Sequence, residues 1–154
     1  EEEINSLYTH PKLHAYISTT HGEGFGLPLF EAAYNGMPVM APDWSGHLDF
    51  LYMPQKTKGK KTRNKAMFSK ISYTLGPVQE FAVWPGVVEP DSKWAFPELG
   101  SIKMSMEEVQ KDYGRFKKRA KDLQKWVLNN FSEDQIHNKL IESINKAEQG
   151  EDNV

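Results

Sequence analysis

The apolar and polar positions between residues 13 and 42 predict a strand, a glycine-rich loop, a helix and a second strand. The stretch LHAYIST (13–19) is short and rich in β-branched and aromatic residues, which is typical of a strand. From residue 27 to residue 34 the apolar spacing becomes helical, with Pro28 in the first turn, where its missing N–H costs nothing. The stretch PVMAP (38–42) has the composition of a short buried strand. This order is a βαβ unit, and it predicts a parallel sheet with a right-handed crossover.

The segments on either side of this unit are less regular. Residues 1–9 predict a short helix whose apolar face contains Ile4, Leu7 and Tyr8. The stretch QKTKGKKTRNK (55–65) has six basic residues and no apolar one, which predicts an exposed basic loop. The two stretches that follow, MFSKISYTLGPV and FAVWPGVVEP, have the pattern of extended segments interrupted by Gly-Pro and Pro-Gly.

Two helices are predicted over residues 105–147. Ser105 and Glu108 have the spacing of a capping box, which places the start of the first helix at Ser105. Its apolar residues recur at alternating spacings of four and three, and they are Val109, Tyr113, Phe116, Ala120, Leu123 and Val127. This stripe either packs on the sheet or pairs with a second copy in a coiled coil. Ser132 and Gln135 form a second cap, and the stripe behind it consists of Ile136, Leu140 and Ile144.

Composition narrows the class of protein. The 154 residues are 38% hydrophobic, which is enough for one packed domain, and the net charge of −2 does not suggest a nucleic-acid binder. There is no cysteine, which excludes disulfides, thiolate nucleophiles and cysteine-ligated zinc. No apolar run has the length of a membrane span. We therefore expect a soluble, cytoplasmic protein, either free or peripheral at a membrane surface, and the absence of an initiator Met leads us to expect a fragment, a single partial domain over 1–154.

The loop HGEGFG (21–26) has the composition of a ligand site. In open α/β sheets, ligands bind beyond the carboxyl ends of the strands, and the N–H groups that open a helix favour an anion such as a diphosphate. Carboxylates repel phosphate, so Glu23 and Glu31, eight positions apart, should contact sugar hydroxyls instead. Glu31 is placed to accept hydrogen bonds from a vicinal diol such as a ribose, and Glu23 to face a group beyond the phosphates. This geometry predicts a nucleotide sugar as the ligand.

The same stretch resembles a known family. EGFGLPLFEAAYNGMPVMAPDWSG is similar to the EX7E signature of retaining glycosyltransferases with the GT-B fold, family 4, whose common form is close to E-G-F-G-L-P-x-x-E-A-x-x-x-G-x-P-V. The matching positions are Glu23, Gly24, Phe25, Gly26, Leu27, Pro28, Glu31, Ala32, Gly36, Pro38 and Val39. A weaker similarity continues through Ser45-Gly46 and through the stretch KWAFPELGSIKMSMEEV.

The resemblance implies a fold, an activity and roles for particular residues. It implies a Rossmann-like parallel sheet flanked by helices, the latter part of the C-terminal, donor-binding domain of a GT-B enzyme. The implied parent enzyme moves a sugar from a nucleotide diphosphate sugar to a hydroxyl acceptor, with retention and without a metal or other cofactor, in polysaccharide or glycoconjugate biosynthesis. Glu31 would bind the ribose and Glu23 the transferred sugar, as the catalytic carboxylate.

The resemblance also implies what the chain lacks. The backbone of residues 24–27 (Gly24, Phe25, Gly26, Leu27) would hold the sugar and diphosphate, and Thr20 would add a hydroxyl contact. The N-terminal acceptor domain and the basic pair for the diphosphate would lie outside these residues, so we expect the fragment alone to be inactive.

Simpler interpretations stay open for each of these residues. The two carboxylates either bind a donor or only offset the helix dipole. His21 either contacts the ligand or is solvated, and Trp44 and Trp94 either stack on a ligand or fill the space between sheet and loops. The basic loop either binds anionic lipid or a phosphorylated acceptor, or is a solvated run of charge. The chain as a whole is either part of a transferase or a non-catalytic nucleotide-sugar-binding or interaction module.

Overall fold

The computed structural model describes residues 6–56 and 61–148. Its strands and helices follow one another in this order: β1 (Tyr16–Ile17), α2 (Leu27–Tyr34), β2 (Val39–Pro42), α3 (Leu48–Leu51), β3 (Tyr52–Lys56), β4 (Thr62–Ala66), β5 (Ser69–Ile71), β6 (Tyr73–Pro77), the 3-10 helix η1 (Glu80–Ala82), β7 (Lys93–Pro97), α4 (Leu99–Lys111), α5 (Tyr113–Asn130) and α6 (Glu133–Glu148).

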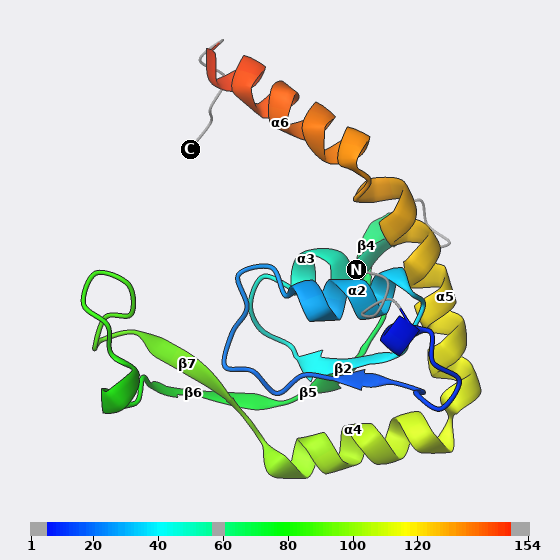
Figure 1. Cartoon of the computed structure of the whole chain (residues 1–154), viewed down its shortest axis with the longest axis horizontal. Coiled ribbons are helices and arrows are strands. Elements are labelled where there is room, and N and C mark those ends of the chain that lie inside the picture. Colours follow the sequence, from blue (N-terminus) through cyan, green and yellow to red (C-terminus); the bar gives the residue numbers. More distant parts are fainter. Residues whose placement is uncertain (1–5, 57–60, 149–154) are drawn as a thin grey trace.

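The centre of the fold is a small parallel sheet with the strand order β1-β2-β5 (Figure 1). Neighbouring residues of β2 point to opposite faces, as the strand period requires. Val39 and Ala41 pack into a cluster with α2, α3 and the second half of α5, whereas Met40 packs with Val109 and Phe116 on the α4 side. Both faces are covered by helices, which is why β2 is buried along its whole length. The predicted α/β fold, a parallel sheet flanked by helices, is confirmed at this level.

The predicted βαβ unit is present with the expected bounds. The helix runs over Leu27–Tyr34 and the second strand over Val39–Pro42, and β1 and β2 pair in parallel. The first strand is shorter than predicted, because only two of its residues pair with β2. In the predicted N-terminal helix, residues 6–8 are helical, while Ile4 lies outside the described residues.

The described part of the basic stretch 55–65 is largely exposed, as predicted, but most of the stretch is not a loop, so that part of the prediction is wrong. Residues 55–56 and 62–65 belong to β3 and β4, which pair in an antiparallel hairpin, and 57–60 lie outside the described residues. The hairpin is held at its base, where Tyr52, Met53 and Ala66 pack against the core, so its exposed arms need no apolar residue of their own.

The C-terminal region contains three helices rather than two. Ser105 lies inside α4, which begins at Leu99 after Pro97, so the predicted capping box is wrong. Ser105 is buried, and its hydroxyl donates to the Ser69 hydroxyl instead (2.7 Å). The second predicted cap is present, because the Gln135 N–H donates to Ser132 Oγ (3.4 Å) just before α6.

The apolar stripe from Val109 to Val127 packs inward. The chain breaks between α4 and α5 at Asp112. Val109 and Phe116 pack in the cluster on the α4 side of the sheet, whereas Leu123 and Val127 pack in the cluster on its other face. Of its predicted members, Val109, Phe116, Ala120, Leu123 and Val127 are buried and Tyr113 is half-buried. The coiled-coil interpretation of this stripe is therefore not needed. By contrast, α6 extends away from the sheet (Figure 1), and its apolar residues are exposed.

Candidate functional site

Two loops meet at the carboxyl edge of the parallel sheet, the edge at which open α/β folds bind ligands. The first follows β1 and contains residues 18–26, including the predicted ligand loop; the second follows β2 and contains residues 43–46. We call them the first loop and the second loop.

The two loops are clamped together at Glu23. Ser45 Oγ accepts a hydrogen bond from the Glu23 N–H (2.8 Å) and donates one to the Glu23 carbonyl (2.6 Å). The Gly46 N–H donates to the same carbonyl (3.0 Å). Three hydrogen bonds thus fix the Glu23 backbone, while its carboxylate has no hydrogen bond or ion pair within 6–56 and 61–148.

This clamp depends on unusual backbone geometry in the second loop. Ser45 has a φ of 87°, which is unfavourable for a residue with a side chain. A Cβ on Gly46 would lie 1.9 Å from the Gly24 carbonyl oxygen, so no other residue fits there without moving the first loop. The sequence contained Ser45-Gly46 only as a weak part of the resemblance, and nothing in it indicated contact with Glu23.

The first loop is also tied to β7 through His21. The Ala95 N–H donates to the His21 carbonyl (3.2 Å), and His21 Nδ1 lies 2.8 Å from the Ala95 carbonyl. A carbonyl oxygen only accepts hydrogen bonds, so the proton of this contact is on Nδ1 of His21. The ring stacks on Trp94, with centroids 5.0 Å apart, and meets Phe96 edge-on at 4.7 Å. His21 is thus a packed anchor rather than a solvated loop residue.

The loop ends at an open helix N-terminus. Gly26 precedes α2 with a φ of 85°, no side chain caps the helix, and Pro28 lies in its first turn. A Cβ on Gly26 would lie 3.1 Å from the Cβ of His47, whereas nothing lies within 4 Å of one on Gly24. The loop is therefore closely packed at Gly26 and open at Gly24, next to uncapped backbone N–H groups that favour an anion.

Three other residues that were predicted to contact the ligand, Phe25, Leu27 and Thr20, lie around this N-terminus. The Phe25 ring packs against Phe30 and Phe50, with centroids 5.2 and 5.0 Å away, and so anchors the loop from behind. Leu27 is exposed, and the exposed Thr20 has its hydroxyl 3.2 Å from that of Ser18.

Glu31 lies just beyond the first turn of α2 and is half-buried. Its carboxylate interacts with the Tyr8 phenol. Burial of this phenol, followed by its interaction with the Glu31 carboxylate, raises the pKa of Tyr8 to about 12. The pKa of Tyr16 is also raised, first by burial and then by the negative charges of Glu23 and Glu31. Tyr16 therefore experiences the fields of both predicted carboxylates.

Sequence reasoning missed these two tyrosines. The sequence pattern places Tyr8 on an apolar helix face and Tyr16 in a strand, although a phenol is also a hydrogen-bond donor. Their rings lie 6.1 Å apart.

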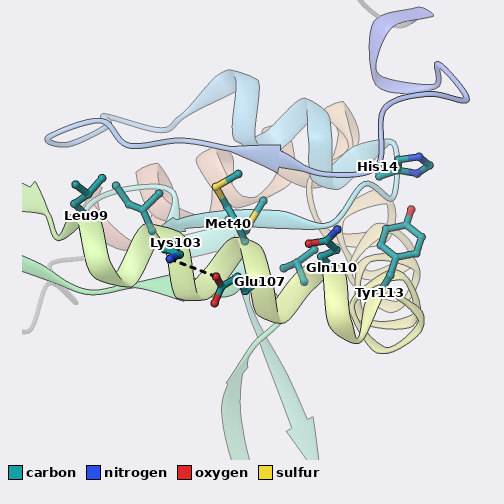
Figure 2. Close-up of a pocket in the computed structure, with 10 residues that line it drawn as sticks. His14, Met40, Leu99, Lys103, Glu107, Gln110 and Tyr113 are labelled. Atoms are coloured by element: carbon teal, nitrogen blue, oxygen red, sulfur yellow. Dashed lines mark ion pairs between the residues drawn. The ribbon is translucent and has the colours of Figure 1, made fainter.

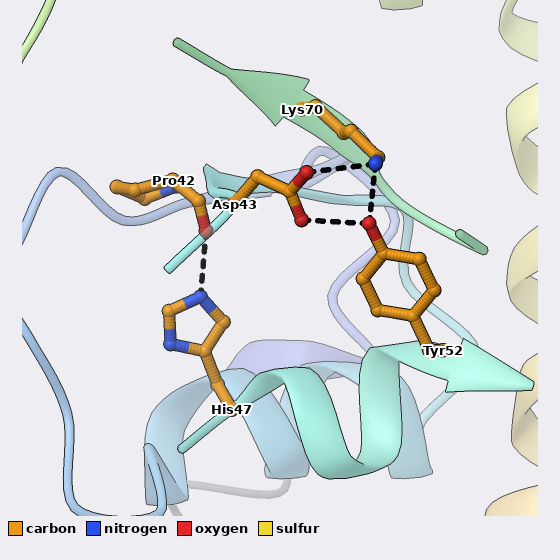
Figure 3. A network of polar contacts seen from close by, with 5 residues as sticks. All are labelled: Pro42, Asp43, His47, Tyr52 and Lys70. Carbon is orange, nitrogen blue, oxygen red and sulfur yellow. Dashed lines mark hydrogen bonds and ion pairs between the residues drawn. The ribbon is translucent and has the colours of Figure 1, made fainter. Parts of the chain in front are cut away.

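A cation lies at the carboxyl edge, but it is already paired (Figure 3). Lys70 Nζ lies 2.7 Å from Asp43, Tyr52 donates to the same carboxylate (2.7 Å), and Lys70 also contacts the Tyr52 hydroxyl. Partial burial lowers the pKa of Lys70, but its hydrogen bonds and attraction to Asp43 and Tyr52 outweigh this and raise it. Lys70, Asp43 and Tyr73 border a hollow of about 290 Å³. Beside it, the Trp44 ring lies 5.6 Å from that of Tyr73.

His47 supports the second loop from beneath. It is buried, and its Nε2 lies 2.8 Å from the Pro42 carbonyl (Figure 3). Nδ1 is buried without a partner among the described residues. Nε2 therefore carries the proton, and the ring joins the end of β2 to the start of α3.

A larger hollow, of about 800 Å³, lies elsewhere, along α4 (Figure 2). Met40 and Val109 form part of its apolar wall, and the Lys103–Glu107 ion pair (3.8 Å) borders it. Because it lies on the α4 side of the sheet and contains none of the first-loop residues, it is separate from the candidate site. A small polar ligand such as a nucleotide sugar is not suited to so apolar a wall.

Within 6–56 and 61–148 no group of three or more His, Asp or Glu side chains is placed to hold a metal ion. No helix in that part of the chain is long and apolar enough to cross a membrane.

Comparisons of the chain with protein-family models, with curated proteins and with solved structures find no significant match.

Proposed function

We propose that this chain is the donor-binding part of a retaining glycosyltransferase with the GT-B fold, and that its ligand is a nucleotide diphosphate sugar. The observation that carries the proposal is the clamp at Glu23. Three hydrogen bonds fix its backbone beside an uncapped helix N-terminus, and its carboxylate is left without a protein partner among the described residues. A carboxylate held in this way repels a neighbouring diphosphate, unless a polyhydroxyl group such as a sugar lies between the two.

The assignments follow the direction of the first loop. The N–H groups at the start of α2 and the open space at Gly24 suit the diphosphate, whose negative charge increases as the sugar leaves. Glu23 then contacts the transferred sugar and stabilises positive charge at the anomeric carbon. Glu31, in the next turn of the helix, accepts hydrogen bonds from the ribose diol. Tyr8 interacts with this carboxylate and leaves it acceptor capacity for the diol.

One observation favours the alternative, a nucleotide-sugar-binding module without transferase activity. Lys70 at the carboxyl edge is neutralised by Asp43, so it does not supply positive charge to a departing diphosphate. A transferase needs that charge from elsewhere in its parent protein, whereas a binding module does not need it.

Calorimetric titration of the full chain with UDP-, GDP- and ADP-sugars tests both forms of the proposal. Glu31→Gln keeps an acceptor for Tyr8 but weakens the hydrogen bonds to the ribose diol. The affinity for both the sugar nucleotide and the corresponding free nucleoside diphosphate should therefore fall about tenfold or more. Glu23→Gln should lower the affinity for the sugar nucleotide by a similar factor and leave the affinity for the free nucleoside diphosphate almost unchanged.

The matched control is Glu142→Gln, which removes the same charge from the exposed surface of α6. Absence of binding to any of these sugar nucleotides, or equal effects of all three substitutions, would contradict the donor site. Binding that obeys the predicted pattern, together with release of the diphosphate when a suitable acceptor and the parent protein are supplied, would favour the transferase over the binding module.

A further inference from the structure

The charges of this chain are strongly segregated along its sequence. Twelve of its 19 Lys and Arg residues lie in residues 52–66 and 113–130, which contain one of its 21 Asp and Glu residues. These two segments therefore have a net charge of +11 and the rest of the chain has −13, which add up to the overall −2. The near-neutral total conceals a strongly basic region.

The described parts of the two segments lie side by side in the fold. Residues 52–66 contain the hairpin β3–β4 and residues 113–130 are α5, and both pack against the same core cluster. Lys65 of β4 and Arg119 of α5 line one hollow of about 360 Å³. Figure 1 shows β4 next to α5. We call the solvent-facing side chains of β3, β4 and α5 the basic surface.

The cations of the basic surface are largely uncompensated. Eight cations of β3, β4 and α5 have no ion-pair partner in the part of the chain that the structure describes: Lys56, Arg63, Lys65, Lys117, Lys118, Arg119, Lys121 and Lys125. Arg115 differs, because Glu108 and Asp112 both pair with it at 2.8 Å. The pKa of Lys117 is lowered, first by burial and then by the positive charge of Lys121. Such repulsion between cations costs stability in the free protein, and a polyanion would relieve it.

The hairpin presents its charges as a row. Arg63 pairs with Gln55 and Lys65 with Met53, so no carboxylate lies across the ribbon from either cation. Because side chains alternate along a strand, Arg63 and Lys65 project from the same face.

Two features favour a membrane over a nucleic acid. The described rings of the two segments, Tyr52, Tyr113, Phe116 and Trp126, are buried or half-buried, so they give bases no platform for stacking. Leu128 is 41% exposed and follows Lys121 by seven residues, which places an apolar side chain on the same side of α5 as a cation. A cation next to an apolar side chain suits the headgroup region of a bilayer.

We propose that the basic surface docks the protein on an anionic lipid bilayer, with lipid phosphate and carboxylate headgroups as its ligands. The proposal is independent of the donor assignment, since the basic surface contains no residue of the first or second loop. The acidic remainder of the chain is repelled by the same bilayer, which orients the molecule.

Cosedimentation of the full chain with vesicles tests this docking. We expect binding to phosphatidylcholine vesicles that contain phosphatidylserine, little binding to phosphatidylcholine alone, and release at an ionic strength of about 0.5 M, where the Debye length is only a few ångströms. Each exposed cation near such a surface changes the partition coefficient about fivefold, so Arg63→Gln/Lys65→Gln/Lys118→Gln should weaken binding by about a hundredfold.

The matched control is Lys12→Gln/Lys93→Gln/Lys146→Gln, which removes three exposed cations outside the two segments. It should bind almost as the parent chain does, and circular dichroism checks that both variants are folded. Equal weakening by the two triple variants, or equal binding to neutral vesicles, would overturn the proposal. So would tighter binding of an RNA or DNA duplex than of the acidic vesicles, or full competition by millimolar inorganic phosphate, since each would identify a different ligand.

Discussion

Removing the Ser45 hydroxyl tests the loop clamp most directly. Ser45→Ala deletes two hydrogen bonds to the Glu23 backbone, at 2.8 and 2.6 Å, and leaves the one from Gly46. Each neutral hydrogen bond contributes about 1 kcal/mol, so the free energy of unfolding should fall by about 2 kcal/mol. Donor affinity should fall about tenfold in addition, because the Glu23 backbone is no longer fixed.

Ser45→Gly separates the hydrogen bonds from the backbone strain. Glycine loses the same hydroxyl but adopts the φ of 87° without steric cost. A side chain in this conformation costs about 1 kcal/mol or more, so Ser45→Gly should be about 1 kcal/mol more stable than Ser45→Ala.

The assay is urea unfolding followed by tryptophan fluorescence, to which Trp44, adjacent to Ser45, contributes. Ser72→Ala is the control, because Ser72 is exposed and its hydroxyl forms no hydrogen bond with the described residues. The clamp would be refuted if Ser45→Ala unfolded at the same urea concentration as the parent chain, or if Ser45→Gly were the less stable of the pair.

Three further predictions concern Gly46, Tyr8 and Ser105. Gly46→Ala should displace the first loop and abolish donor binding in the calorimetric titration, because its Cβ would lie 1.9 Å from the Gly24 carbonyl oxygen. Gly24→Ala should leave the fold intact, because nothing lies within 4 Å of its Cβ. Stability should fall as the pH rises from about 10 to about 12, because the folded-state pKa of Tyr8 is raised from 10.0 to about 12 and the unfolded chain loses that proton first; Tyr8→Phe should flatten part of this decline in urea titrations. Ser105→Ala should lower the free energy of unfolding by about 1 kcal/mol through the lost bond to Ser69 without changing helicity by circular dichroism, whereas a capping role would predict a loss of helix.

The parts of the fold that could be predicted are those encoded locally. Helix α2 has a proline in its first turn and a glycine just after its end, and its predicted bounds are correct. The buried strand β2 was recognisable from an unbroken apolar run. Both signals lie within a few residues of the element that they define, so no knowledge of the tertiary structure was needed.

The errors arise where distant contacts override local signals. Ser105 has the sequence of a cap, but its hydroxyl is used by Ser69, 36 residues away, and the helix has already begun. Strands β3 and β4 lack apolar alternation, because packing at the base of the hairpin holds them. In each case a partner that is remote in the chain supplies the stabilisation.

The candidate site shows the same division. Glu23, Glu31 and the glycines between them could be selected from a short stretch, because their chemistry is unusual for a turn and a helix start. The residues that position them could not: Ser45 reaches Glu23 across 22 positions, and Ala95 reaches His21 across 74. A single sequence contains no record of such pairs, whereas the spatial arrangement reveals them.

Both proposals depend on where this chain has positive charge that is not already paired. A departing diphosphate needs positive charge that is not already neutralised, and Lys70 is held by Asp43 and Tyr52. The large excess of positive charge lies instead on the hairpin and α5, on side chains that belong to neither loop of the candidate site. Under the docking proposal, electrostatic attraction acts on this chain mainly by placing it on an anionic surface. Under the donor proposal, recognition at the first loop relies on backbone N–H groups and two carboxylates, which select a ligand by its hydroxyls as much as by its charge.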